Sequence, residues 1–391
     1  MGKHEFAKRI QSEPANIHSV GDRAILNTIA CDGFRQKFDM SSYRPTQKRI
    51  RQVNGGFGED QMGTITKKDG TLYRTHIIRD LDNYGVIITG GSTNSIATKV
   101  ILRERAHDGS PESGSPYYLS CLDQISGAQI PIRSYGVGYT NWSYSNPRDA
   151  LKPGESALEL SIVSSDPDRS LLRQLLKKNS LFVNAIELAK YIDDPFAYIP
   201  FPDPKDSSQQ VDQNSINLWW KYWFQVVDRG MRGKEIPHPG QTSQRGFEGF
   251  FTHTLKMTEE LAKKTNHTHL TAIPTWLYVW HAFRERGYEP VDAIQNQEMV
   301  EFINQLNTIT LPNQTTIRDL SPKHPLTSWL AVAPFVMQLN PQFTPQLGID
   351  ETRENRFKHI YSELNAALCV DGLVKTYPFY PGYNLWICKK L

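Results

Sequence analysis

The pattern of apolar and polar residues changes near residue 200. Before it, short runs of β-branched and aromatic residues alternate with turns rich in Gly, Ser and Thr. After it, apolar residues recur at the three- and four-residue spacing of helices. We therefore predict an α+β protein, with a β-rich domain with irregular loops over residues 1–165 and a mainly helical domain over 166–391. A Pro-rich segment at 195–214 interrupts the helical domain.

The clearest strand signal is a hairpin centred on Asp69-Gly70. Alternating runs at 64–66 and 71–78 flank this dipeptide, and both of its residues tolerate the positive φ that tight hairpin turns require. Further strand-like runs lie at 86–89, 117–121, 130–135 and 158–163. Residues 96–103 fit a strand or a helix, and residues 20–60 are predicted to be irregular.

Helices are predicted on both sides of the Pro-rich segment. Asp166 and Pro167 suit the start of one helix, and Pro274 and Gly287 suit the start and the end of another. A Trp-rich helix follows Asn214. The remaining predicted helices lie at 1–12, 180–193, 246–265, 290–308, 325–339 and 351–369, and a terminal hairpin is predicted over 374–388.

Composition and charge exclude several classes of protein. The formal net charge is only +3, so the chain as a whole is not a strongly basic nucleic-acid-binding domain. Its four cysteines are far apart and form no CxxC pair, which argues against a zinc knuckle and predicts free thiols. The first residues lack the apolar run of a secretory signal, and no segment reaches the ~18 apolar residues of a membrane span. We expect a cytoplasmic protein, or a virion protein if the source is viral.

Patterns typical of phosphate chemistry are incomplete in this chain. A strand at 86–89 leads into Gly90 and Gly91, but the spacing of a phosphate-binding loop and its lysine is missing. Lys68-Asp69-Gly70 resembles an aspartyl nucleophile motif, yet Lys67 stands where the carboxylate is needed. Hairpin turns explain both segments.

Metal sites are equally poorly supported. Asp80 and Asp82 could share Mg²⁺ on a strand, although turn capping explains them better. The histidines His253, His267, His269 and His281 lack the paired spacing of a metal helix. We therefore predict no cofactor, no metal and no catalytic residue, while a site assembled from distant residues stays open.

Basic residues gather in two short segments. One precedes residue 52, and the other follows the Trp-rich helix in a glycine-rich connection, where arginines and backbone N–H groups can both approach phosphates. Trp219, Tyr222 or Trp223 could then stack on bases. The predicted nucleic-acid-binding residues are Arg44, Lys48, Arg49, Arg51, Arg229, Arg232, Lys234 and Arg245.

These observations favour a non-enzymatic structural protein that self-assembles and packages single-stranded nucleic acid, RNA above all, as a viral nucleoprotein or capsid protein does. The expected partners are further copies of the chain, in a homo-oligomer, and the nucleic acid. Two alternatives stay open: a metal- or nucleotide-dependent phosphoester enzyme, and a scaffold that binds only proteins. The preferred interpretation depends on the two basic segments converging on one electropositive groove.

Overall fold

A computed structural model describes residues 20–53, 56–79, 83–90, 95–106, 151–164, 223–239, 246–274, 276–311, 314–338 and 385–391, with single positions between 352 and 366. The chain forms two compact units. The first comprises Met1–Arg169, Gln244–Ile273 and Trp386–Leu391, and the second comprises Ser170–Ser243 and Pro274–Leu385. Each unit therefore contains more than one segment of the chain.

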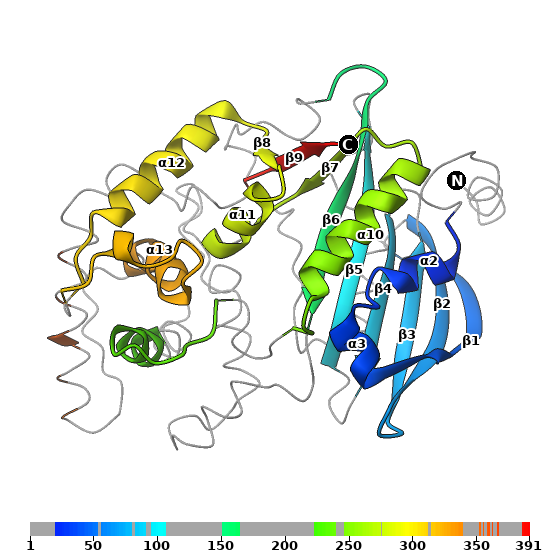
Figure 1. Cartoon of the computed structure of the whole chain (residues 1–391). Helices are drawn as coiled ribbons and strands as arrows, with labels where there is room; N and C mark the ends of the chain where they lie inside the picture. Colours follow the sequence, from blue (N-terminus) through cyan, green and yellow to red (C-terminus); the bar gives the residue numbers. More distant parts are fainter. Residues whose placement is uncertain are drawn as a thin grey trace. The chain divides into compact units, whose positions relative to one another are not determined.

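The first unit is built on a mainly antiparallel sheet (Figure 1). Its first six strands follow chain order, and each is antiparallel to the one before it. β7 (His269–Ala272) is parallel to β6, and β9 (Ile387–Lys390) is antiparallel to β7. The six strands are β1 (Phe38–Val53), β2 (Gly56–Lys67), β3 (Leu72–Arg79), β4 (Asn83–Gly90), β5 (Ser95–Ala106) and β6 (Ser156–Ser164).

Three helices cover one side of this sheet: α2 (Asp22–Asn27), α3 (Asp32–Lys37) and α10 (Phe250–Lys264) (Figure 1). The buried side of α10 carries Phe250, Leu255 and Leu261. Hydroxyl groups also join the helices, because Thr254 Oγ1 donates to the Thr28 carbonyl at 2.8 Å. We call this the helix-covered side of the sheet and the other, on which Leu72 and Arg74 of β3 are exposed, the open side.

An aromatic cluster ties α3 to the sheet. The rings of Phe34 and Phe38 stack at 4.4 Å, and Tyr73 of β3 meets Phe38 edge-on at 4.9 Å. Phe247 packs edge-on against Phe34 at 5.0 Å. Gly33 allows the close approach, because a Cβ there would lie 2.6 Å from the backbone nitrogen of Glu248. A bare backbone is thus required where α3 meets the segment before α10.

The second unit is mainly helical around a tryptophan core. Trp223 and Trp329 are fully buried. Trp223 Nε1 donates to the Trp329 carbonyl at 3.3 Å, and Trp329 Nε1 donates to the Pro237 carbonyl at 2.8 Å. The described elements are a helix over 223–231, α11 (Leu277–Arg284), β8 (Glu289–Pro290), α12 (Ala293–Asn307), η2 (Ile317–Asp319) and α13 (Pro325–Gln338).

The α+β class is confirmed. The Asp69-Gly70 hairpin is also confirmed: Lys67 N donates to the Thr71 carbonyl at 2.8 Å and Gly70 has φ 89°. Residues 96–103 belong to strand β5, and the helices predicted at 246–265, 274–287, 290–308 and 325–339 are present as α10, α11, α12 and α13. The irregular conformation predicted for 20–60 is wrong, because that range holds α2, α3, β1 and part of β2.

The division between the two units differs in detail from the predicted domains. The chain leaves the first unit after Arg169, near the predicted boundary at 165, but Gln244–Ile273 and Trp386–Leu391 return to it. The return has a physical reason, since α10 covers the sheet while β7 and β9 extend it. The predicted elements at 1–12, 117–121, 130–135, 166–193 and 374–384 lie outside the described residues, as does most of 351–369.

Candidate nucleic-acid interface

Arg44, Lys48, Arg49 and Arg51 all lie on β1, the first strand of the sheet. Lys48 stands opposite Gln61, and Arg49 stands opposite Asp60 on β2. Because neighbouring residues of a strand point to opposite sides, the strand separates Lys48 from Arg49. The predicted basic segment therefore does not form one continuous patch. Arg51 stands opposite Gly58 in the register.

The open side carries a cross-strand row that joins two arginines. Arg44 on β1 lies opposite Thr64 on β2, and Thr64 lies opposite Arg74 on β3. Directly opposed residues of antiparallel strands share one side of the sheet. Both arginines are exposed, and Thr64 between them is partly exposed. Neither arginine has an acidic partner among the described residues, although Arg44 Nη1 donates to the Ser41 carbonyl at 2.7 Å.

Arg74 is a residue that the sequence interpretation missed. Its signal was present in the hairpin, where Leu72 and Arg74 alternate with Tyr73 and Thr75. The structure shows that this alternation separates the two sides of β3: Leu72 and Arg74 are exposed, whereas Tyr73 and Thr75 are buried. A basic residue on the open side of β3 thus complements Arg44 of β1.

Farther along the strands, the residues on the open side are buried. Asp60 and His76 are only 4 % and 7 % exposed, and His76 Nδ1 lies 3.2 Å from both carboxylate oxygens of Asp60. Arg49, opposite Asp60, is half-buried. The accessible basic surface is therefore centred on Arg44 and Arg74, with Arg49 at its margin.

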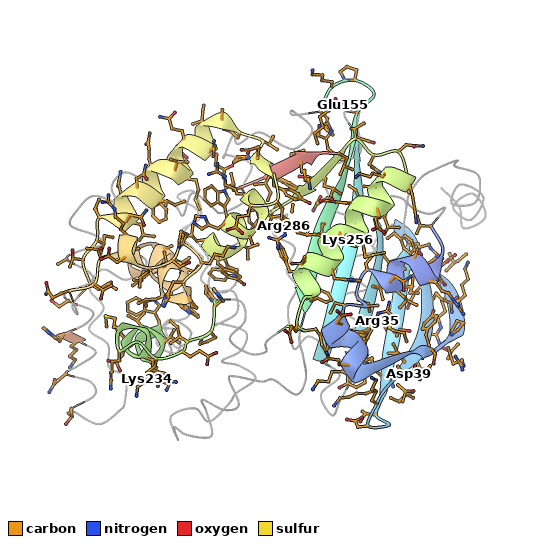
Figure 2. All side chains as sticks on the ribbon, viewed as in Figure 1. Arg35, Asp39, Glu155, Lys234, Lys256 and Arg286 are labelled. Atoms are coloured by element: carbon orange, nitrogen blue, oxygen red, sulfur yellow. The ribbon has the colours of Figure 1, made fainter. Side chains whose placement is uncertain are left out.

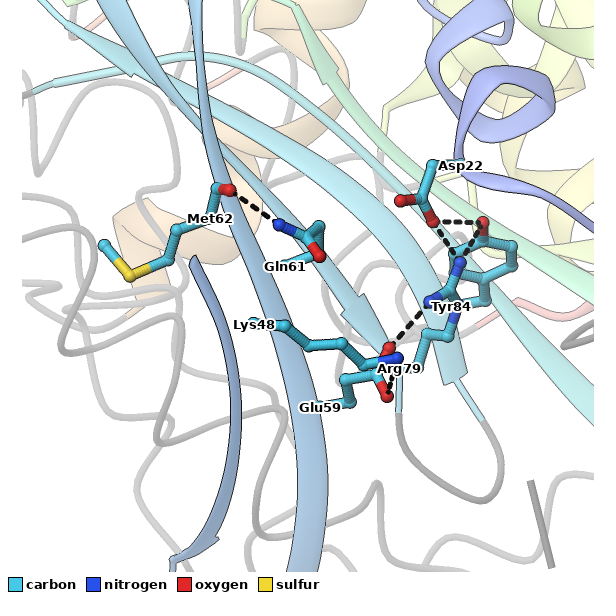
Figure 3. Close-up of polar contacts among 7 residues, drawn as sticks. All are labelled: Asp22, Lys48, Glu59, Gln61, Met62, Arg79 and Tyr84. Atoms are coloured by element: carbon cyan, nitrogen blue, oxygen red, sulfur yellow. Dashed lines mark hydrogen bonds and ion pairs between the residues drawn. The ribbon is translucent and has the colours of Figure 1, made fainter. Parts of the chain in front are cut away.

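Lys48 belongs to an ion-pair network on the helix-covered side (Figure 3). Its Nζ lies 2.7 Å from Glu59 Oε2, and the other oxygen of Glu59 accepts from Arg79 Nη1 at 2.7 Å. Arg79 also pairs with Asp22 of α2 and donates to the Tyr84 hydroxyl at 3.0 Å. Lys48 thus helps to neutralise a buried carboxylate, which weakens its assignment as a nucleic-acid ligand.

Burial shapes the protonation of this network and of Tyr43, which senses the charges of Asp22 and Arg79. Burial raises the pKa of Tyr43 to about 12, and the Asp22 carboxylate acts in the same direction. For Arg79, burial disfavours the charged form, but Tyr84, Asp22 and Glu59 outweigh it and raise the pKa. The guanidinium therefore stays charged at every pH at which the fold persists. The network joins α2 to β2, β3 and β4, a structural role.

The second basic segment follows the helix over 223–231. Arg229 and Lys234 are exposed, whereas Arg232 forms an ion pair with Asp228, one helical turn before it. Gly233 takes φ 67°, and the Lys234 backbone N–H donates to the Arg229 carbonyl at 3.0 Å. Cations at a helix C-terminus also complement its dipole. Arg245 lies outside the described residues.

The first basic segment belongs to the first compact unit, whereas Arg229, Arg232 and Lys234 of the second segment belong to the second unit. Their convergence on one groove accordingly stays a prediction. Trp223 has a different role from the one predicted, because it is fully buried and cannot stack on a base. Trp219 and Tyr222 lie outside the described residues.

The alternative sites contain little that the structure can test. Asp80, Asp82 and the segment 91–94 lie outside the described residues. Lys67 forms an ion pair with Asp69 at 2.7 Å, as suits a hairpin turn. Within the described parts of the chain, no three His, Cys, Asp or Glu side chains gather as metal ligands.

The histidines have structural surroundings. Burial lowers the pKa of His267 to about 4. The Thr265 hydroxyl donates to the Leu261 carbonyl at 2.9 Å, so its oxygen accepts from His267 Nδ1 at 2.7 Å. His253 Nε2 donates to the Asn27 carbonyl at 2.8 Å, which joins α10 to α2. Burial lowers the pKa of His269 and of His281 as well.

A groove of about 770 Å³ opens in the first unit where β1 begins. Its lining includes the cations Arg35, Lys67 and Lys68 and the carboxylate Asp39. Arg35 and Asp39 lie at the same end of the sheet (Figure 2). Sequence interpretation missed this groove, since it joins α3 to the β2–β3 turn across 30 residues of chain.

Among the helices that the structure describes, none has the length and the apolar character needed to cross a membrane. No protein-family model matches the chain, and no curated protein or solved structure is significantly similar to it.

Proposed function

We propose that the chain binds single-stranded nucleic acid, RNA above all, through the open side of its sheet, and that copies of it assemble along the bound strand. The observation that carries the proposal is the row Arg44–Thr64–Arg74. Two exposed guanidinium groups and a hydroxyl stand on adjacent strands of a rigid element. Phosphate oxygens accept hydrogen bonds from both kinds of group.

The spacing of the row suits a nucleic-acid backbone. Neighbouring strands lie about 4.8 Å apart, so the backbones at Arg44 and Arg74 are about 10 Å apart. Long arginine side chains can therefore reach phosphates along a short stretch of extended strand. No buried acid neutralises either guanidinium among the described residues, in contrast to Lys48 and Arg232.

Binding of this kind depends on charge and tolerates different base sequences. Of the described tryptophans, Trp223, Trp276, Trp280 and Trp329 are buried and Trp386 is partly exposed, and the proposed contacts are to the backbone of the strand. A few phosphate contacts per subunit suffice when many copies bind side by side, which agrees with a net charge of only +3. Arg229 and Lys234 supply further contacts in the same proposal.

The test is binding of a fluorescent 20-nucleotide oligouridine RNA at low salt, measured by anisotropy. The double variant Arg44→Gln, Arg74→Gln should weaken binding at least about tenfold, because two charge-assisted contacts are lost. Lys256→Gln is the matched control, since Lys256 is exposed on α10 of the same unit (Figure 2). Light scattering with and without RNA then tests assembly. Absence of RNA binding by the nuclease-treated, salt-washed protein would refute the proposal.

A further inference from the structure

We infer that the groove at the start of β1 binds one nucleotide unit of the strand, with its phosphate between Arg35 and Lys68 and its base against Met40. The inference rests on the proposed function and names a specific subsite for it. It concerns the first unit alone, since every residue of the groove belongs to that unit.

The cations of the groove are not equivalent. Lys67 is held by Asp69 at 2.7 Å, whereas Lys68 is exposed and forms no salt bridge among the described residues, although its charge acts on the Asp39 carboxylate. Arg35 Nε donates to the Ala30 carbonyl at 2.6 Å, and its other nitrogens are not engaged by any described residue. Arg35 and Lys68 therefore supply the two cations that an incoming phosphate would meet.

The one carboxylate in the lining is engaged by its own turn. Asp39 Oδ1 accepts from the Ser41 backbone N–H at 2.9 Å and from the Ser41 hydroxyl at 2.7 Å. These hydrogen bonds lower the pKa of Asp39, so it stays charged and opposes an anion. Two cations still exceed this one carboxylate, and the turn holds its position within the bulge of β1.

The groove also offers the two other surfaces that a nucleotide needs. Phe38 and Met40 are apolar lining residues, and Met40 is partly exposed, so it can contact the face of a base. Thr66 supplies a hydroxyl. A volume of about 770 Å³ falls within the range of about 300–1,000 Å³ that is typical of small-ligand sites.

The position of the groove connects it to the proposed interface. Thr66 lies two residues after Thr64 on β2, on the same side of the sheet. A strand that crosses the row Arg44–Thr64–Arg74 therefore reaches the groove at Thr66, and it turns around the end of the sheet to meet Arg35, because α3 lies on the helix-covered side (Figure 1). Exposed Leu72, opposite Thr66, lines the path between them.

The experiment compares two ligands on the full chain. Uridine 5′-monophosphate is titrated by calorimetry, and the 20-nucleotide RNA by anisotropy. Lys68→Gln should weaken mononucleotide binding about threefold to tenfold, and Arg35→Gln, Lys68→Gln should weaken it further. Lys68→Gln is informative alone, because Lys68 makes no side-chain contact that the fold requires among the described residues. Melting curves verify that each variant folds.

Two further variants separate the parts of the inference. Met40→Ser should weaken binding of the mononucleotide but leave inorganic phosphate unaffected. Arg44→Gln, Arg74→Gln should weaken binding of the RNA while mononucleotide binding stays within about twofold. Inorganic phosphate that competes as well as the mononucleotide would overturn the assignment of a base to the groove.

The outcomes distinguish this inference from the proposed function. One outcome is that RNA binding requires Arg44 and Arg74, does not change when Arg35 and Lys68 are substituted, and is accompanied by no mononucleotide binding. This outcome overturns the assignment of a nucleotide to the groove but agrees with the proposed function. Mononucleotide binding without RNA binding overturns the proposed function and supports the groove. Weaker binding of the mononucleotide and of the RNA by Lys68→Gln, at unchanged stability, supports the groove and the proposed function together.

Discussion

Arg44 on β1 and Arg74 on β3 are separated by strand β2, whose Thr64 stands directly opposite both of them. This relationship brings together two segments separated by 30 positions in the sequence. It also excludes Lys48, which strand β1 directs toward Glu59 on the helix-covered side. Charge on the open side thus depends on strand register as well as on composition.

The salt dependence of RNA binding provides a direct count of phosphate contacts. For single strands, the logarithm of the binding constant falls by about 0.7 per phosphate contact for each decade of salt. The double variant Arg44→Gln, Arg74→Gln should therefore reduce the slope of the logarithm of the binding constant against the logarithm of the salt concentration by about 1.4. Anisotropy titrations over a roughly sixfold range of KCl concentration, from about 50 to about 300 mM, measure this slope. Lys256→Gln should keep the wild-type slope. Weaker binding at an unchanged slope would show that the arginines act on the fold and contact no phosphate.

The network around Arg79 should be essential for stability. Arg79→Met leaves Glu59, whose side chain is 7 % exposed, with Lys48 as its remaining cation, and it removes the arginine that pairs with Asp22. Breaking a buried ion pair costs up to about 3–5 kcal/mol, which chemical denaturation will measure. Lys48→Met is the control, because Lys48 is 54 % exposed and should contribute less than about 1 kcal/mol. Equal losses in the two variants would contradict the assigned roles.

Gly33 should tolerate no side chain. A methyl group at Gly33 would lie 2.6 Å from Glu248 N and 2.8 Å from Glu248 O, both backbone atoms that cannot rotate away. Gly33→Ala should lower the free energy of unfolding by about 1–3 kcal/mol. Gly21→Ala, at a position with no atom within 4 Å, should cost less than about 1 kcal/mol. A neutral Gly33→Ala would mean that α3 and the segment before α10 separate readily.

Stability should fall in mild acid because of His267. Its pKa is about 4 in the folded chain and about 6.5 in an unfolded chain, so the unfolded state binds the proton more readily. The contribution is complete above pH 6.5 and is lost as the pH falls toward 4, up to about 3 kcal/mol. Denaturation of His267→Gln should show less of this decline than the wild type. His253→Gln should retain it, and a wild-type slope in His267→Gln would assign the effect to other groups.

Local patterns predicted the elements whose signals lie close together in sequence. The Asp69-Gly70 turn with its alternating arms, and the helix between Pro274 and Gly287, depend on neighbouring residues. The α+β class followed from the same periodicities. Strand β1 could not be recognised in this way, since Arg44, Gln47 and Lys48 are polar and exposed on an edge strand. Its pairing with β2 defines it.

The candidate site illustrates the same limit. Arg44 was identified because it lies in a basic run, whereas Arg74 stands alone between apolar residues and becomes meaningful only beside Thr64. The partner of Arg79, Asp22, lies 57 positions earlier, so no local pattern indicates the network. Arg35 of α3 and Lys68 of the hairpin line one groove, and no local pattern indicates this either. Contacts of this kind depend on tertiary structure.

The order in which the first unit is assembled has a consequence for biosynthesis. Its sheet begins with β1 but is completed by β9, after the chain has passed through the whole second unit. On the ribosome, β1 to β6 emerge long before α10, β7 and β9 can join them. Nascent chains will therefore expose an unfinished apolar surface until α10, β7 and β9 have left the ribosome, and they should associate with chaperones until then.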